Sequence, residues 1–213
     1  IATHLNQILQ QHIHELLGTE DVQKWLELLA DNSPKLAEEL VPGTVTVKVL
    51  LKVLQSLLRE QVSIRDMRSI AEALAVSNSN SQDPVALTAC VRVALGRQIL
   101  QGIVGSEIVV PVITVDPGLE QILLQSIQQA TKAGIEDIAL VEPTLIERLQ
   151  ANLKEVAQKQ EIAGKPVILL TSGLLRYPII KLLRTSGIEV HVLAYEEIPD
   201  NKQVSVEASI GSE

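Results

Sequence analysis

The sequence contains almost no aromatic residues. Among 213 residues there is no phenylalanine, and only Trp25, Tyr177 and Tyr195 carry aromatic rings. Proteins that bind single-stranded nucleic acids stack the bases on aromatic side chains, so this class of function is disfavoured. Hydrophobic residues still make up 46% of the chain. We therefore expect leucine, valine, isoleucine and alanine to build the core.

Cysteine is nearly absent as well. The single Cys90 excludes an intrachain disulfide and a metal site built from several cysteines. It lies in the apolar run ALTACVRVAL, which favours a small buried residue over a reactive thiol. The histidines form only a weak metal pattern, because His12 and His14 would point to different sides of a helix. We therefore expect neither a metal nor a cofactor.

Long apolar runs are also missing. No stretch approaches the roughly 20 apolar residues of a membrane-spanning helix, and no signal peptide is visible. Because the chain begins with Ile1 in what reads as a helix, we expect a piece of a longer protein.

The charge is predominantly negative, with a net value of -8. Residues 105–213 hold 9 of the 18 basic side chains but 15 of the 26 acidic ones. Such a surface repels a polyanion, which argues against nucleic acid as a partner.

Residues 1–104 carry apolar residues three and four apart, the spacing of one helix face. The segment IATHLNQILQQHIHELLG predicts a first helix, and TVTVKVLLKVLQSLLREQV is mostly helical although its start alternates. Ser63, followed three residues later by Asp66, predicts a capped helix in SIRDMRSIAEALAV. Further helix starts are predicted at Thr19, at Ser33 with Pro34, and at Asp83 with Pro84, which opens one long helix through VALTACVRVALGRQILQGIV.

Residues 105–213 change to strands that alternate with helices. Strands are predicted in EIVVPVITVD, KPVILLTS, EVHVLAYEEI and QVSVEASIG, and helices in LEQILLQSIQQATKAG (closed by Gly134), PTLIERLQANLKEVAQKQ and GLLRYPIIKLLRTSG. The predicted fold class is α+β with several subdomains. An all-helical N-terminal subdomain is followed by a small α/β subdomain with a mixed sheet, and the boundary falls near residues 102–106.

One segment suggests ligand binding. In LLTSGLL, the residues Thr171, Ser172 and Gly173 sit where a strand meets a helix, a turn whose N–H groups can bind an anion. This supports an alternative function, a nucleotide-binding or small-ligand-binding α/β domain. No G-x-G-x-x-G, G-x-x-x-x-G-K-[ST] or G-x-S-x-G motif accompanies the turn, so Ser172 as a plain helix cap is favoured.

The helix pairs of the first half allow a further alternative, a helix-turn-helix DNA-binding module. The segment from Arg59 to Glu72 carries three arginines and three acidic residues. A balanced face of this kind does not attract phosphates, so DNA binding is the least favoured interpretation.

Several blocks together resemble a known family. QVSIRDMRSIAEAL, DVQKWLELLADNSPKLAEELVPG, QDPVALTACVRVALGR and VLAYEEIPDNKQVSV occur in the order found in the FlhA-type export gates of flagellar and virulence type III secretion systems. The resemblance covers nearly the whole chain. The chain is similar to the C-terminal cytoplasmic part of those proteins. The ending AYEEIPDNKQV favours the flagellar branch.

The resemblance implies a protein whose N-terminal part spans the bacterial inner membrane, with a cytoplasmic part of four subdomains in a nonameric ring. Residues 1–18 would be the returning helix of the first subdomain, 19–104 the helical third and 105–213 the α/β fourth. This chain would lie on the cytoplasmic side. The family's docking cleft for chaperone and substrate complexes would lie mainly outside it, on the second subdomain and the rest of the first.

We therefore expect a non-enzymatic, ring-forming scaffold for protein export. The resemblance implies as partners other copies of the protein, chaperone–substrate complexes and components of the export ATPase complex, with a membrane contacted only through a part outside this chain. Arg65, Asp66 and Arg68 are the candidates for a subunit interface or an intrachain brace. The simpler interpretation, in which Asp66 caps a helix while Arg65 and Arg68 are solvated, stays open.

Overall fold

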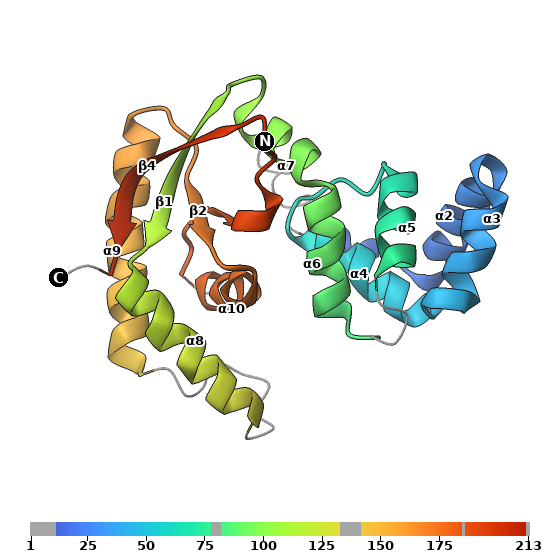
Figure 1. Ribbon diagram of the computed structural model, residues 1–213, viewed down its shortest axis with the longest axis horizontal. Coiled ribbons are helices and arrows are strands. Elements are labelled where there is room, and N and C mark those ends of the chain that lie inside the picture. The colour runs from blue at the N-terminus through green and yellow to red at the C-terminus, as the bar shows by residue number, and fades with distance from the viewer. Residues whose placement is uncertain (1–11, 78–81, 133–141, 185, 212–213) are drawn as a thin grey trace. The chain divides into compact units, whose positions relative to one another are not determined.

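The computed structural model describes residues 12–77, 82–132, 142–184 and 186–211 (Figure 1). The chain divides into two compact units, Ile1–Ile99 and Leu100–Glu213. The first is helical and the second combines helices with a sheet. The predicted α+β class is therefore confirmed.

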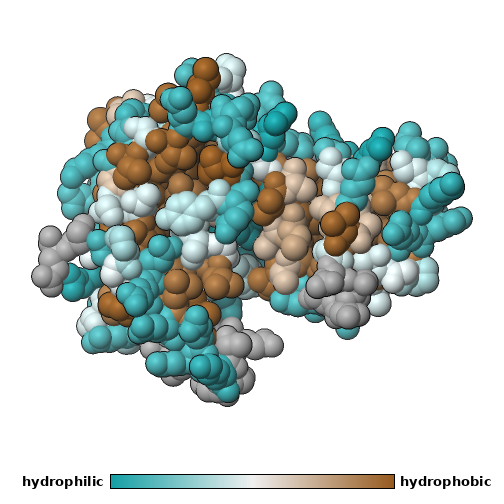
Figure 2. Space-filling model, in the orientation of Figure 1, coloured by the Kyte–Doolittle hydropathy of each residue, from teal (hydrophilic) through white to brown (hydrophobic). Residues whose placement is uncertain are grey.

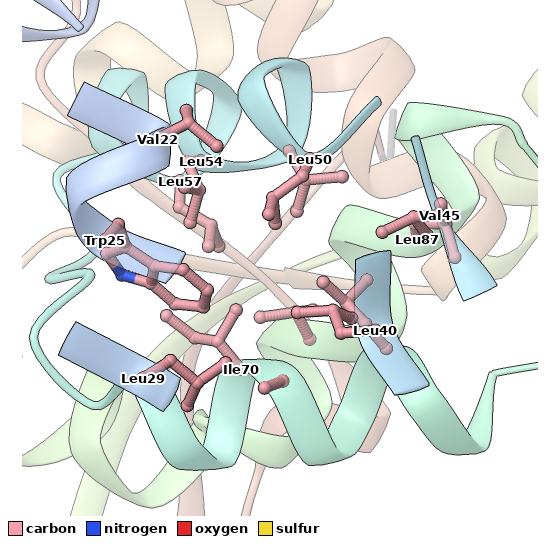
Figure 3. Close-up of a cluster of buried hydrophobic side chains, with 14 of the residues drawn as sticks. Val22, Trp25, Leu29, Leu40, Val45, Leu50, Leu54, Leu57, Ile70 and Leu87 are labelled. Carbon is pink, nitrogen blue, oxygen red and sulfur yellow. The ribbon is translucent and has the colours of Figure 1, made fainter. Parts of the chain in front are cut away.

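The first unit consists of helices, and α2, α4, α5 and α6, whose bounds follow, each bury side chains in its core. Residues 12–16 are helical, and the following elements are α2 (Thr19–Asn32), α3 (Pro34–Glu38), the π-helical η1 (Glu39–Thr44), α4 (Val47–Arg59), α5 (Met67–Val76) and α6 (Pro84–Ala94). Their buried side chains form one cluster, shown in Figure 3, which includes Val22, Trp25, Leu40, Leu50, Leu54, Leu57, Ile70 and Leu87. Aliphatic residues thus build this core, as the composition predicts.

Two helix starts differ from the predictions. α5 begins at Met67, and its N-cap is Asp66, whose Oδ1 accepts a hydrogen bond from the Ser69 N–H at 3.1 Å. The predicted cap Ser63 instead accepts from the Arg65 N–H within the preceding loop. α2 is capped at Gly18 and not at Thr19. The starts predicted at Pro34 and Pro84 are confirmed.

The long helix expected after Asp83 is broken. It ends at Ala94, and α7 (Gly96–Val104) continues after a bend of 68°. Glycine is a weak helix former, and Leu95 between the two helices is buried, which explains the break.

Cys90 on α6 is exposed, so the prediction of a buried cysteine is wrong. Figure 2 shows an apolar strip over α6, where Val85 and Val93 are also exposed.

The second unit is built on a four-stranded sheet. Its strands are β1 (Val109–Val115), β2 (Ile168–Thr171), β3 (His191–Ala194) and β4 (Gln203–Ile210), in the order β3-β2-β1-β4. All of these pairings are parallel, so the predicted mixed sheet is wrong. The reason is that β4 does not pair with β3; residues 195–202 carry the chain to the opposite edge, where β4 lies beside β1.

Pro111 is compatible with β1 although β1 is an inner strand. The pairing of β1 with β2 involves Ile113 and Thr114, whereas its pairing with β4 extends along the whole strand. At Pro111, β1 therefore has only one paired neighbour, as an edge strand does, and proline is tolerated in such positions.

Helices cover one face of this sheet. They are α8 (Pro117–Lys132), α9 (Pro143–Ile162) and α10 (Gly173–Leu183), and a short 3₁₀-helix, η2 (Tyr195–Glu197), follows β3. Ile113, Leu169 and Val192 lie side by side on adjacent strands. They share one buried cluster with residues from all three helices. The closing residue predicted for α8, Gly134, lies outside the described residues.

No single helix in the described part of the chain has the length and apolar character of a membrane span. Two bent helix pairs are together long and apolar enough for a span, by length and composition alone. They are residues 34–44 with 47–59 and residues 84–94 with 96–104.

Candidate functional site

The connector between α4 and α5, residues 60–66, carries most of the candidate interface. Of the three predicted residues, Asp66 is half-buried and is occupied as the N-cap of α5. Its carboxylate accepts from a backbone N–H one turn into the helix and also offsets the positive end of the helix dipole. The carboxylate of Asp66 is therefore engaged as a helix cap.

Arg68 lies on the first turn of α5. Its Nε donates to Glu72 Oε1 at 2.7 Å, a contact between residues four apart on an exposed helix face. The hydrogen bond and the negative charge of Glu72 raise the pKa of Arg68 above its ordinary value. Exposed pairs of this kind contribute little to stability, so the guanidinium stays available for exchange with a partner's carboxylate.

Arg65 is exposed at the end of the connector. Among the described residues, its guanidinium makes neither a hydrogen bond nor an ion pair. Its backbone N–H donates a hydrogen bond to Ser63 Oγ. Of the three candidates, Arg65 thus presents an unengaged charge, whereas Asp66 and Arg68 have partners within α5.

The sequence patterns did not predict the ion pair at the first residue of the connector. Arg92 Nη1 lies 2.9 Å from Glu60 Oε2, and the side chains are only 3% and 7% exposed. The sequence could have indicated this buried arginine. Arg92 lies four residues after Thr88 and three before Leu95, so it shares a helix face with buried residues. An arginine on a core face needs a buried partner.

One side of the connector lines an apolar groove of about 740 Å³ in the first unit. Its lining residues are Ile13, Leu16, Leu17, Asp21, Leu58, Gln61, Val62, Ser63, Ile64 and Arg65. Leu16 is 71% exposed and Ile13 is 43% exposed, so two large apolar side chains face solvent here. Asp21 and Arg65 give the groove one charge of each sign.

In the second unit, the predicted ligand turn lies at the carboxyl end of β2. Ser172 is the N-cap residue of α10, but its buried Oγ makes no hydrogen bond within the described residues, whereas the Thr171 hydroxyl and the Ser172 N–H are engaged by Glu120. Glu120 Oε1 accepts from the Ser172 N–H at 3.0 Å and from Thr171 Oγ1 at 3.3 Å. The carboxylate of Glu196 lies close to Gly173, 3.4 Å from where a Cβ would be. Burial, and then the charge of Glu120, raises the pKa of the nearby Tyr195. Two carboxylates at this turn disfavour a bound phosphate.

A parallel sheet can also bind ligands between two neighbouring strands whose chain connections leave toward opposite edges of the sheet, and this position is filled too. Here it lies between β1 and β4. Gly211, with a φ of +98°, packs so closely that a Cβ there would clash with the side chain of Leu119. Nearby in the same unit, Arg176 and Glu197 form a buried ion pair at 3.3 Å.

Metal chemistry has no support in the described ranges, where no group of three or more His, Cys, Asp or Glu side chains converges to hold an ion. The connector and its groove combine exposed apolar side chains with a charge of each sign.

Comparison with known proteins identifies the family of the chain. The sequence profile of the FHIPEP family matches residues 1–203. The chain belongs to the FHIPEP family. FlhA, the flagellar biosynthesis protein of Escherichia coli K12, is 44% identical over 99% of the chain. The FlhA of Yersinia enterocolitica is 42% identical over the same share. The chain spans only 29% of each of these proteins.

Two solved structures share the fold of this chain. The nonameric SctV cytoplasmic domain of enteropathogenic E. coli superposes with a TM-score of 0.82 at 26% identity, covering 97% of this chain and 61% of that one. The CdsV and CdsO complex of Chlamydia pneumoniae gives 0.84 at 25% identity, covering 98% and 60%. The resemblance to FlhA-type export gates is thereby confirmed.

Proposed function

We propose that this chain is part of the cytoplasmic portion of a flagellar type III protein export gate. It would be a ring-forming, non-enzymatic scaffold at the bacterial inner membrane. The observation that carries the proposal is the 44% identity to a flagellar FlhA over 99% of the chain. The fold it shares with a domain solved as a nonamer supports the assignment.

We further propose that residues 1–18 belong to the first cytoplasmic subdomain, 19–104 to the third and 105–213 to the fourth. The division of the chain into compact units after Ile99 lies close to the second of these boundaries. Residues 1–11 lie outside the described part of the chain.

The ring contact is assigned to the connector between α4 and α5. Arg65 supplies a charge that has no partner within the described residues, and the groove beside it exposes Ile13 and Leu16. Rings are formed by heterologous contacts, in which one patch meets a different patch of the next copy. A free charge beside an apolar groove is suited to such a contact.

The partners proposed for the second unit are components of the export ATPase complex, whereas chaperone–substrate complexes would dock mainly on the parts of the protein outside this chain. The acidic excess of residues 105–213 favours basic partner segments. A related protein, CdsV, was solved together with CdsO.

A chimera tests the proposed function. Residues 1–213 replace the matching part of E. coli FlhA, and the chimera is expressed in cells that lack FlhA. We expect swimming in soft agar to be restored, because the identity and the fold extend over this whole region. Immunoblotting of membranes and limited proteolysis check that the chimera is present and folded. A folded, membrane-bound chimera that leaves the cells non-motile contradicts the proposal.

A further inference from the structure

The connector between α4 and α5 is fixed at its first end by a tight turn and an ion pair. Val62 N–H donates to Leu57 O at 2.8 Å and Gln61 N–H to Leu58 O at 3.0 Å. Gln61 itself adopts a φ of +59°, a left-handed conformation that non-glycine residues rarely hold without surrounding constraints. The buried pair of Glu60 with Arg92 supplies such a constraint, because it ties the start of the connector to α6.

The middle of the connector is held from α2. Trp25 is buried in the core, and its Nε1–H donates to the backbone carbonyl of Ile64 at 3.3 Å. Figure 3 shows the ring of Trp25 within the cluster of buried side chains. One side chain therefore fills the core and also fixes the carbonyl that directly precedes Arg65.

The far end is held by Asp66, the N-cap of α5. Hydrogen bonds or an ion pair thus restrain the connector at its start, in its middle and at its end, while Ser63 and Arg65 are exposed. A segment that is already ordered loses little backbone freedom when it binds, so more of the contact energy appears as affinity.

We propose that Trp25 and the Glu60–Arg92 pair are positioning residues for the contact between copies of this protein. They hold the connector in the geometry in which Arg65 meets the neighbouring copy. This inference rests on the proposed function. A second copy is the occupant we favour because a domain of the same fold was solved as a nonamer.

Trp25→Phe is the decisive variant, since it keeps an aromatic ring in the core and removes the N–H that binds Ile64. We expect amide hydrogen exchange at residues 61–65 of the purified chain to rise about tenfold, the effect of losing one ordering contact. Gln82→Met is the matched control. It removes another long-range bond from a side chain to the backbone in the same unit, from Gln82 Nε2 to Thr44 O, without touching the connector.

The functional readout is photo-cross-linking between copies in the E. coli chimera, with p-benzoylphenylalanine in place of exposed Ser63. We expect Trp25→Phe and Arg65→Glu each to lower the yield of cross-linked dimer severalfold, and Gln82→Met to leave it unchanged. Unchanged exchange in Trp25→Phe overturns the inference. Raised exchange with a normal cross-link overturns it too, because the order of the connector would then have no role in assembly.

The two proposals fail in different ways. If the parent chimera swims but gives no cross-link between copies from position 63, the connector is not at the ring contact and this inference fails alone. If the folded chimera does not swim, the proposed function fails.

Discussion

Arg92 on α6 and Glu60 at the end of α4 form a buried ion pair, with Nη1 2.9 Å from Oε2. Arg92 lies within QDPVALTACVRVALGR, one of the blocks that carry the family resemblance, and Glu60 directly precedes another, QVSIRDMRSIAEAL. The pair therefore links a stretch that looks like plain core helix to the connector that carries the candidate interface.

Arg92→Met tests how much this ion pair contributes to the stability of the first unit. Removing one partner leaves Glu60 as a buried charge without its arginine, so we expect a loss of about 3–5 kcal/mol in the free energy of unfolding. Urea unfolding followed by circular dichroism measures it. The double variant Glu60→Leu with Arg92→Met should regain much of that loss, because apolar residues can replace a buried pair. A single variant as stable as the parent would show that the pair is not needed.

Asp66→Ala and Ser63→Ala distinguish the observed cap from the predicted one. Because Asp66 accepts from the Ser69 N–H, its loss should cost about 1 kcal/mol of stability. Ser63 only bonds within the loop, so Ser63→Ala should change stability by less than about 0.5 kcal/mol. Thermal unfolding of both variants provides the comparison, and the reverse order of effects would restore Ser63 as the cap.

Arg65→Glu and Arg68→Glu separate the two exposed arginines in the swimming assay with the chimera. We expect Arg65→Glu to reduce swimming strongly, since it reverses a charge assigned to the ring contact. Arg68→Glu should have a weaker effect, because Arg68 already shares its charge with Glu72. Both proteins must retain the parent's melting temperature for the comparison to hold. Normal swimming of a folded Arg65→Glu variant removes the interface role.

Nucleotides should not stabilise the chain. The Ser172 N–H is engaged by Glu120, and the carboxylate of Glu196 lies beside Gly173, so a phosphate at this turn would face two negative charges. We expect no change in melting temperature with ATP, GTP or NAD at about 1 mM, where even a weak specific ligand would give a measurable shift. A reproducible rise with any of them would revive the ligand-binding alternative.

The isolated 213-residue chain should be a monomer in dilute solution. The ring contact proposed here is a small patch beside one connector, and contacts well below about 1,000 Å² rarely hold subunits together alone. Light scattering should give a mass near 23.2 kDa. A stable higher mass at micromolar concentration would show that residues 1–213 suffice for assembly.

The sequence by itself determined the features that depend on neighbouring residues. Apolar spacing located most of the helices, although it did not show the break between α6 and α7. Runs rich in branched apolar residues located the four strands of the sheet, and the starts at Pro34 and Pro84 followed from local backbone chemistry. Local signals also separated the helical part from the α/β part. The motif blocks identified the family, because they occur in the family's order along the chain.

Only the tertiary structure decided which distant residues meet. Nothing local in QVSVEASI shows that β4 pairs with β1 and not with β3, because strand order depends on where the intervening chain can cross. The bonds from Glu120 to Ser172, from Trp25 to Ile64 and from Arg92 to Glu60 each join residues on different elements. Burial of a polar group is favourable only when its partner is placed within hydrogen-bonding distance, and that placement is set by the packing of the whole unit.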